Sequence, residues 1–280
     1  MAFPADVAPL IIWQEFDLSS ADWPDLIAGT SVVHHYAWST IPSTANSDPQ
    51  TDLSTNVQST LNLLEALRRC HQPPRLVFIS SGGTVYGRLK AASAHEDHPR
   101  APITAYGAGK ASIELYLGYY REIFGLDCRV ARLANPFGAG QNFARGQGAV
   151  TTFLERALAS RPITIWGDGE TIRDYIHVSD AAAGLAALAL APALRDSWIF
   201  NIGSGHGISL NGVLEVLEAT LCRRLIVHRQ PARAFDVPIS VLDITRAKEQ
   251  LHWSPRLSFS DGVVRTLWDL KSNVLEGGVV

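Results

Sequence analysis

The sequence has few cysteines and no long apolar run. Its three cysteines, Cys70, Cys128 and Cys222, lie far apart without CxxC spacing, which argues against a disulfide framework and against a zinc site. The most apolar stretch, 181–194, is short and is interrupted by a glycine and a proline, so it predicts a buried helix and not a membrane span. We therefore expect no membrane partner.

An excess of positive charge is also absent. The net charge is −3, which gives no polybasic surface for nucleic acid or an anionic membrane. The first residues lack the basic and then apolar order of a secretion signal, so we expect a cytoplasmic protein. With 280 residues and 46% hydrophobic residues, the chain is long enough to bury a substantial core.

The first two-thirds of the sequence alternate short β-branched runs with long helical patterns. This order predicts an α/β fold with a doubly wound parallel sheet covered by helices on both faces. Leucines recur every three or four residues in the first of two long amphipathic stretches, and mixed apolar residues do so in the second. The expected strands are 10–16, 31–36, 75–80 and 126–132, and the expected helices are 50–70 and 104–124.

After Pro136 the sequence changes to glycine-rich turns and short mixed elements. Asp168-Gly169 is typical of a β-hairpin turn, in which Asp168 would cap the turn. The change predicts a smaller C-terminal portion, formed mainly by 136–280, around the ends of the strands.

Tyr106 and Lys110 are the strongest chemical signal in the sequence. Residues four apart on a helix share a face, and an ammonium group beside a phenol lowers its pKa, so Tyr106 could accept a hydroxyl proton near neutral pH. A YxxxK pattern by itself is weak, because such a pair also occurs on helix surfaces. Its context is a strand that ends in small hydroxyl residues, Ser80 to Gly87, where α/β folds bind ligands.

Three more segments complete the pattern: 132–138 (RLANPFG), 166–178 (WGDGETIRDYIHV) and 233–236 (RAFD). Together with the serine-rich strand end and the YxxxK pair, they make the chain resemble the extended short-chain dehydrogenase/reductase family, and most closely its UDP-glucose 4-epimerases. The resemblance runs from about residue 16 to residue 270. It implies a Rossmann-like NAD-binding domain over 1–135, which also receives segments of 170–202, and a mainly substrate-binding portion over 136–280.

By this resemblance, Tyr106 is the general base and Lys110 binds the nicotinamide ribose while tuning the tyrosine. The cofactor is NAD, and the substrate is a UDP-hexose. The residues that match the cofactor site are Asp17, Leu18, Tyr36, Ala37, Trp38, Asn56, Ser80, Tyr106, Lys110, Leu133 and Pro136, where Asp17 and Leu18 would meet the adenine. The helices 50–70 and 104–124 resemble the pair through which family members form homodimers.

Four residues match the substrate site of the family. Asn135 would meet the phosphates, Arg173 and Arg233 would grip the diphosphate, and Asp236 would accept from the uridine ribose. Guanidinium groups offer paired donors that suit phosphate oxygens, which supports the arginine assignment independently. A surface salt bridge is the alternative for each arginine. His34, His35 and His177 lack metal-ligand spacing, and we expect them to pack at strand ends.

Two features depart from the family pattern. The strand, glycine-rich turn and helix that normally open the dinucleotide site are absent, and the run 203–207 lies too late to replace them, so we expect a chain that is short at its N-terminus. The position usually held by the catalytic serine or threonine is Gly82, so Ser81 or Thr84 must substitute, and we slightly favour Thr84. Gly83 and Thr84 stand where the dehydratases and decarboxylases carry acidic residues, which disfavours elimination.

The leading hypothesis is epimerisation at C4 of a UDP-hexose, of the UDP-glucose/UDP-galactose type, through a 4-keto intermediate. One alternative is a ketosugar-nucleotide reductase that consumes NADPH. Another is a non-catalytic, N-terminally truncated remnant that acts only as a partner of a longer relative.

Overall fold

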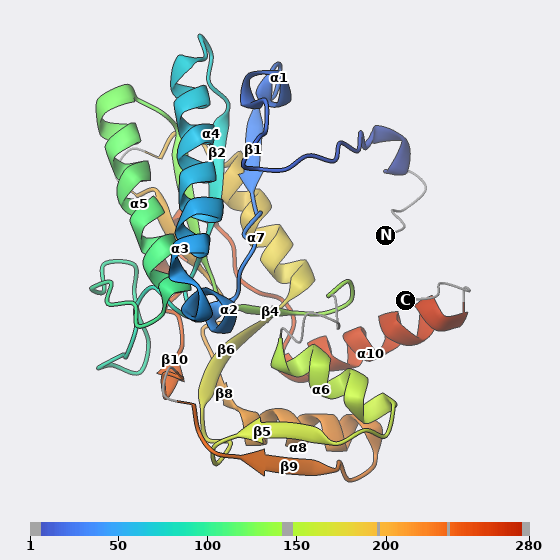
Figure 1. Ribbon diagram of the computed structural model, residues 1–280. Coiled ribbons are helices and arrows are strands. Elements are labelled where there is room, and N and C mark those ends of the chain that lie inside the picture. Colours follow the sequence, from blue (N-terminus) through green and yellow to red (C-terminus); the bar gives the residue numbers. More distant parts are fainter. Residues whose placement is uncertain (1–6, 142–147, 195–196, 234–235, 276–280) are drawn as a thin grey trace.

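The computed structural model describes residues 7–141, 148–194, 197–233 and 236–275. Its main sheet contains four parallel strands in the order β1-β2-β3-β7 (Figure 1). β2 is the centre of the register: it pairs with β1 from Arg75 to Phe78 and with β3 from Leu76 to Ser81. The structure thus confirms the parallel α/β fold and three of the four predicted strands, as β1 (Val32–His35), β2 (Arg75–Ser81) and β3 (Cys128–Leu133), and adds β7 (Ile199–Ile202).

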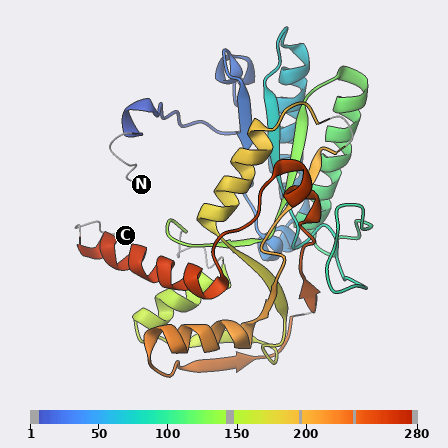
Figure 2. The same cartoon turned by 180° about the vertical axis from the view of Figure 1, so that it is seen from behind.

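Helices cover both faces of this sheet because side chains alternate along its strands. Leu76 and Phe78 of β2 point into one core, shared with α1 (Trp23–Ile27), α4 (Gln58–Arg69) and α5 (Ala105–Phe124). Val77, between them, belongs to the other core, under α7 (Val178–Leu190). Figure 2 shows α7 lying across the face opposite to α4 and α5.

The two predicted long helices are confirmed. The stretch 50–70 forms α3 (Pro49–Asp52), a π-helical turn, η2 (Leu53–Val57), and α4 in one continuous path. The stretch 104–124 forms α5, which begins after Thr104, whose side chain accepts from the Gly107 amide, and ends at Gly125 with a φ of +65°. α2 (Pro42–Ser47) lies before α3 and contacts α5.

The predicted strand at 10–16 is wrong. η1 (Ala8–Leu10) is a short 3-10 helix, and the residues that follow run without strand pairing to α1. The side chains of Leu10, Ile12 and Trp13 are 79%, 87% and 73% exposed. A strand needs a neighbour for its backbone groups, and within the described residues β1 pairs only with β2, so this apolar run has no strand beside it.

The C-terminal portion is built around β6 (Ile172–His177), which pairs with β4 (Asn135–Phe137), β10 (Ile239–Ser240) and β8 (Gly207–Ser209). A third apolar core joins these strands to helices that Figure 1 shows below the main sheet. None of the helices in the described ranges is long and apolar enough to cross a membrane. The remaining elements are α6 (Ala149–Leu158), β5 (Ile163–Trp166), α8 (Leu210–Leu221), β9 (Val227–Gln230), α9 (Thr245–Leu251) and α10 (Phe259–Leu275).

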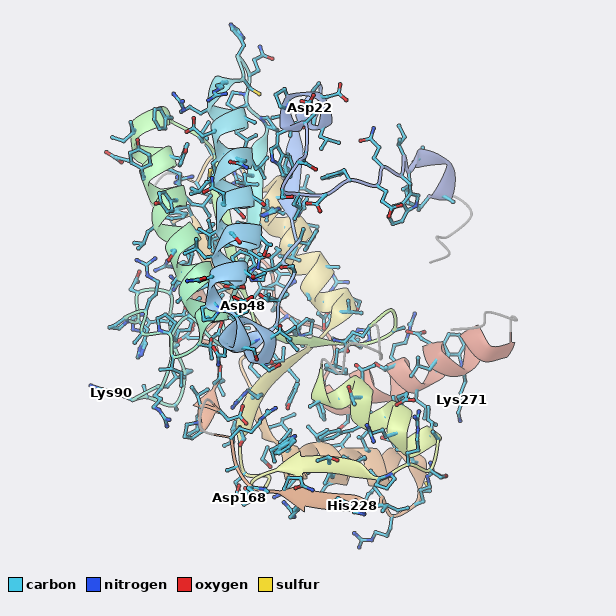
Figure 3. All side chains as sticks on the ribbon, viewed as in Figure 1. Asp22, Asp48, Lys90, Asp168, His228 and Lys271 are labelled. Carbon is cyan, nitrogen blue, oxygen red and sulfur yellow. The ribbon has the colours of Figure 1, made fainter. Side chains whose placement is uncertain are left out.

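The hairpin predicted at Asp168-Gly169 is also wrong, although a turn is present. β5 and β6 flank this turn, but β5 pairs in parallel with β9, from Ile163 opposite Val227 to Trp166 opposite Gln230. Asp168 lies at the edge of the molecule (Figure 3), where its carboxylate caps the turn by accepting from the Glu170 amide at 2.9 Å. The turn sequence fixes the local bend, whereas a distant segment provides the strand partner.

Candidate functional site

A cavity of about 570 Å³ opens where β2 and β3 end and β4 begins. Parallel strands present their carboxyl ends at one edge of the sheet, so residues far apart in the sequence meet there. The cavity brings together most of the predicted catalytic and substrate residues. Its lining includes Tyr36, Ser80, Ser81, Thr84, Tyr106, Leu133, Asn135, Pro136, Arg173, Arg233 and Asp236.

Tyr106 lies in the first turn of α5, half-buried at the wall of this cavity. Its ring meets the indole of Trp38 edge-on, with 5.9 Å between ring centroids. Burial, and then the negative charge of Asp52, raise the pKa of Tyr106 to about 12. The expected lowering of this pKa by Lys110 is therefore not found in this arrangement.

Lys110 lies one turn further along α5, and its side chain is buried. Its Nζ donates to the Ile79 carbonyl at 2.7 Å and lies 3.9 Å from the ring centroid of Trp38 and 4.8 Å from that of Phe78. Burial lowers the pKa of Lys110 to about 7, against the opposing charges of Asp52 and Glu114. Lys110 is not among the lining residues of the cavity, because its amine points into the fold.

A side chain at Gly82, where the resemblance predicts a serine or threonine, would require Leu242 to move. A Cβ atom on Gly82 would lie 2.6 Å from Cδ1 of Leu242, which packs against the strand end from a segment 160 residues away. The predicted substitutes, Ser81 and Thr84, both line the cavity. The Thr84 hydroxyl is buried and has no hydrogen-bond partner among the described atoms. A free buried hydroxyl beside Tyr106 suits contact with a ligand.

The two predicted arginines converge on the same cavity from different segments. Arg173, in β6, donates to the Ile172 and Val237 carbonyls at 2.8 and 2.7 Å, and burial lowers its pKa. Arg233 forms a two-point ion pair with Asp236, at 2.9 and 3.2 Å. Asp236 therefore lies beside Arg233, one of the two arginines that were expected to bind the diphosphate.

A second cavity of about 410 Å³ adjoins the first and shares Asn135, Arg173, Arg233 and Asp236 with it. Its far side is aromatic, with Phe153, Trp166 and Tyr175. Arg173 and Arg233 line both cavities, and the hydroxyl residues Ser80, Ser81 and Thr84 line the first. Cationic groups shared by two adjoining cavities suit a ligand whose anionic part separates two larger groups.

Several predicted cofactor residues do not line this cavity. Asp17 lies in the exposed segment before α1, where its carboxylate accepts from the Ser19 amide at 2.7 Å, and Leu18 packs against the core beneath α1 and α4. Asn56 is buried and accepts from the Ser39 amide at 2.8 Å. Ala37 and Trp38 lie just beyond β1, outside the lining, whereas Tyr36 is part of it.

Sequence reasoning missed a buried ionic network beneath the strand ends. Arg132 binds Glu114 with distances of 2.6 to 3.2 Å, and the Ser80 hydroxyl donates to the same carboxylate at 2.5 Å. Ser80 therefore lines the cavity with its hydroxyl turned to Glu114. The sequence spacing could have indicated Glu114, because it follows Lys110 by four residues and therefore shares its helix face.

His35 and His177 pack within the fold as expected, whereas His34 is exposed and its ring stacks on Tyr36. His35 Nε2 lies 2.9 Å from the Thr60 hydroxyl, and His177 Nδ1 lies 2.7 Å from the Ser179 hydroxyl. Burial lowers the pKa of His35 to about 4, with a further contribution from the charge of Lys110. The described residues contain no group of three or more His, Cys, Asp or Glu side chains that could hold a metal ion.

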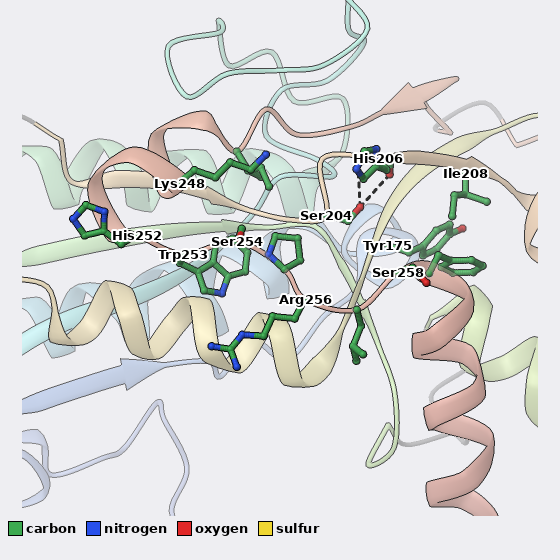
Figure 4. Close-up of a pocket in the computed structure, with 14 residues that line it drawn as sticks. Tyr175, Ser204, His206, Ile208, Lys248, His252, Trp253, Ser254, Arg256 and Ser258 are labelled. Atoms are coloured by element: carbon green, nitrogen blue, oxygen red, sulfur yellow. Dashed lines mark hydrogen bonds between the residues drawn. The ribbon is translucent and has the colours of Figure 1, made fainter.

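A separate cavity of about 830 Å³ lies along the segment 252–259 (Figure 4). Ser204, His206, Lys248 and Trp253 contribute to its lining, which contains none of the predicted site residues. Figure 4 shows the side chains of Lys248 and Arg256 directed away from each other, so its cations do not converge on one point.

Comparison with known proteins places the chain in a family. The sequence profile of the NAD dependent epimerase/dehydratase family matches residues 4–203. A UDP-glucose 4-epimerase from Mycolicibacterium smegmatis is 34% identical over 253 residues, which cover 90% of this chain and 80% of that protein.

Solved structures agree with the sequence comparison. The structure of a UDP-glucose 4-epimerase with UDP-glucose from Thermotoga maritima superimposes with a TM-score of 0.87 at 30% identity, covering 93% of this chain and 84% of that one. A UDP-glucose 4-epimerase complex with NAD from Thermus thermophilus gives a TM-score of 0.83 at 29% identity, covering 94% and 84%. The chain belongs to the NAD dependent epimerase/dehydratase family.

Proposed function

We propose that this protein catalyses epimerisation at C4 of a UDP-hexose with NAD as its cofactor. The observation that carries the proposal is the single cavity in which Tyr106, Thr84 and the pair Arg173 and Arg233 meet. An acid-base group, a buried hydroxyl and two guanidinium groups in one cavity suit a sugar next to a diphosphate. The UDP-glucose 4-epimerases among the similar proteins support the same reaction.

The residues at the strand ends fit the reactive end of NAD. The buried Thr84 hydroxyl has no hydrogen-bond partner among the described atoms, and Leu133 and Pro136 add apolar surface to the same cavity. When bound, NAD supplies the hydride acceptor for oxidation at C4. In the arrangement observed, the Lys110 amine donates to the Ile79 carbonyl and does not line the cavity, so it does not reach a ribose bound there.

Different residues of the cavity transfer the proton, bind the C4 oxygen and bind the diphosphate. Tyr106 accepts the proton of the C4 hydroxyl in its phenolate form, which the raised pKa of the phenol disfavours in the protein without ligand, and returns the proton after the resulting 4-ketose has turned over. Thr84, or Ser81 beside it, donates a hydrogen bond to the C4 oxygen. Arg173 and Arg233 hold the diphosphate while the sugar turns, so the nucleotide stays bound through both steps.

The test is conversion of UDP-glucose to UDP-galactose by the purified protein with NAD, followed by anion-exchange chromatography. We expect conversion by the wild type and a loss of at least about 100-fold in Tyr106→Phe, because the phenol oxygen is the proton acceptor. Oxidation of NADPH in proportion to product would instead indicate a ketosugar reductase. Full activity in Tyr106→Phe would exclude the proposed role of this tyrosine.

We further propose that the protein acts in the cytoplasm as a homodimer. Leu115, Tyr116, Tyr119 and Ile123 form an exposed apolar stripe on α5, with exposures of 61%, 43%, 50% and 60%. Such a stripe suits a symmetric contact between two copies of the helix. Sedimentation velocity of the purified protein tests the dimer.

A further inference from the structure

Three aromatic rings and one carbonyl surround the amine of Lys110. Phe78 lies beneath it in the sheet, Tyr106 is one turn back on the helix, and Trp38 lies on the remaining side, with the shortest distance of the three to Nζ. Tryptophan gives the strongest cation-π contact of the aromatic residues, and more so away from water. The Ile79 carbonyl accepts from Nζ at 2.7 Å.

Trp38 is the outer wall of this aromatic box. Phe78 is fully buried, whereas Trp38 is only partly buried and follows β1 at the carboxyl edge of the sheet. Its ring also packs against the backbone of α5, since a Cβ atom on Gly109 would lie 3.1 Å from Cζ2 of Trp38. The indole Nε1 is buried without a described hydrogen-bond partner, so packing and the cation hold the ring in place.

We propose that Trp38 is a positioning residue for Lys110: its indole closes over the amine and keeps it turned toward Ile79, out of reach of a ligand hydroxyl until the ring moves aside. This inference rests on the proposed function, in which Lys110 does not reach the cofactor ribose in the arrangement observed. It explains how a lysine in a YxxxK pair can lie one helical turn from its tyrosine and still be absent from the cavity lining.

The charges around the box do not pull the amine outward. Asp52 and Glu114 are the carboxylates that act on Lys110, and both are buried and held by other groups. Asp52 accepts from Thr40 and from Asn56. Glu114 is bound by Arg132 and Ser80. The remaining facing groups are Tyr106 and His35, and the positive charge of Lys110 disfavours protonation of His35.

Competitive acetylation of lysines tests the inference without cofactor or turnover. The sequence has four lysines, and Lys90, Lys248 and Lys271 are exposed, so they serve as internal standards (Lys90 and Lys271 are labelled in Figure 3). Acetic anhydride at pH 8, read by mass spectrometry of peptides, gives the rate for each site. In the wild type we expect Lys110 to react at least about tenfold more slowly than the standards, although its lowered pKa leaves more of its amine unprotonated at pH 8, since it must wait for a local opening.

Trp38→Ala should bring the rate of Lys110 to within about threefold of the standards, because the outer wall is removed. Trp38→Phe keeps an aromatic face and should restore most of the protection, which a general loosening of the fold would not do. Trp268→Ala is the matched control, since Trp268 is 64% exposed on α10 and should leave Lys110 protected.

Two results would overturn the inference. One is a wild-type Lys110 that reacts as fast as the standards. The other is a Trp38→Ala protein with unchanged far-ultraviolet circular dichroism in which Lys110 stays protected. If Trp38→Ala does not fold, the comparison of Trp38→Phe with Trp38→Leu decides: equal protection by both would also overturn it. Because the labelling needs no sugar nucleotide, its outcome is separate from that of the epimerase assay.

Discussion

Helix α5 carries two buried charged side chains one turn apart, and the fold treats them differently. The Glu114 carboxylate accepts hydrogen bonds from Arg132 at 2.6 to 3.2 Å and from Ser80 at 2.5 Å. Lys110 is held by one carbonyl and by aromatic faces instead of a carboxylate. A buried charge whose hydrogen bonds are all satisfied stabilises one arrangement. A buried charge with few partners changes its protonation state or its partner more easily.

The same contrast separates two neighbouring regions of the molecule. Beneath the strand ends, the Glu114 network continues from Arg132 through the Tyr86 hydroxyl at 2.9 Å to Asn201 at 2.6 Å, so that its polar groups have partners. At the cavity wall, the Thr84 hydroxyl has none among the described atoms. Unsatisfied polar groups are costly to folding, which suggests that the cavity wall serves binding and the network serves the fold.

Arg132→Met gives the largest expected effect, because it leaves the Glu114 carboxylate buried without its main partner. We expect a loss of about 3–5 kcal/mol in the free energy of unfolding, measured by urea denaturation. The double variant with Glu114→Met should recover most of this loss. Arg265→Met, which breaks an exposed pair with Asp269, is the control and should cost at most about 1 kcal/mol. A similar loss of unfolding free energy in Arg132→Met and Arg265→Met would show that the buried pair matters no more to stability than the exposed one.

Lys110→Met should stabilise the protein in a way that depends on pH. Burial lowers the pKa of Lys110 from 10.5 to about 7, so the unfolded chain binds the additional proton between these values. Charging the buried amine therefore costs most below pH 7, and the cost falls to nothing as the pH rises toward 10.5. We expect an advantage of roughly 5 kcal/mol at most for the variant at pH 6.5, from a pKa lowered by about 3.5, the difference between 10.5 and 7, at ~1.4 kcal/mol per pKa unit.

The measurement is the difference in unfolding free energy between Lys110→Met and the wild type at pH 6.5, 8 and 9.5. This difference cancels the pH-dependent contributions of the other titrating groups, because the two proteins share them. A difference that does not shrink as the pH rises would show that the amine keeps an ordinary pKa inside the box.

Gly82→Ser tests the packing that excludes a serine at the cavity wall. Alone, it should destabilise the protein by about 1–3 kcal/mol, because the new Cβ meets Leu242. Combined with Leu242→Ala, which removes the obstructing atoms, the total loss should be smaller than the sum of the two single losses by about 1 kcal/mol. Strictly additive losses in urea denaturation would show that the two side chains do not compete for this space.

Thr84→Val should have the smallest effect on stability, within about 1 kcal/mol of the wild type, because the hydroxyl it removes has no partner to lose. Its effect on epimerase activity should be much larger, at least about tenfold in kcat, if this hydroxyl contacts the C4 oxygen. Ser81→Ala is the comparison variant for the other candidate hydroxyl. A large loss of stability in Thr84→Val would instead assign this threonine to the fold.

Much of the fold and part of the site could be predicted, because helical periodicity and β-branched runs depend on residues that are close together in the sequence. The 3.6-residue period fixed the two helices now seen as 49–69 and 105–124, and β-branched runs indicated β1, β2 and β3. A helix also determines that Tyr106 and Lys110 share a face. Parallel strands then bring their carboxyl ends, and the hydroxyl residues there, to one edge of the sheet.

The sequence by itself therefore determined the parallel α/β architecture and indicated most of the catalytic and substrate residues that line the cavity at its edge. Only the tertiary structure decided that 10–16 is not a strand, that β5 pairs with β9, that Leu242 fills the space at Gly82 and that Lys110 points inward under Trp38. The physical reason is that strand pairing, steric room and the pKa of a buried group depend on atoms that are distant in the chain, and no local period encodes them.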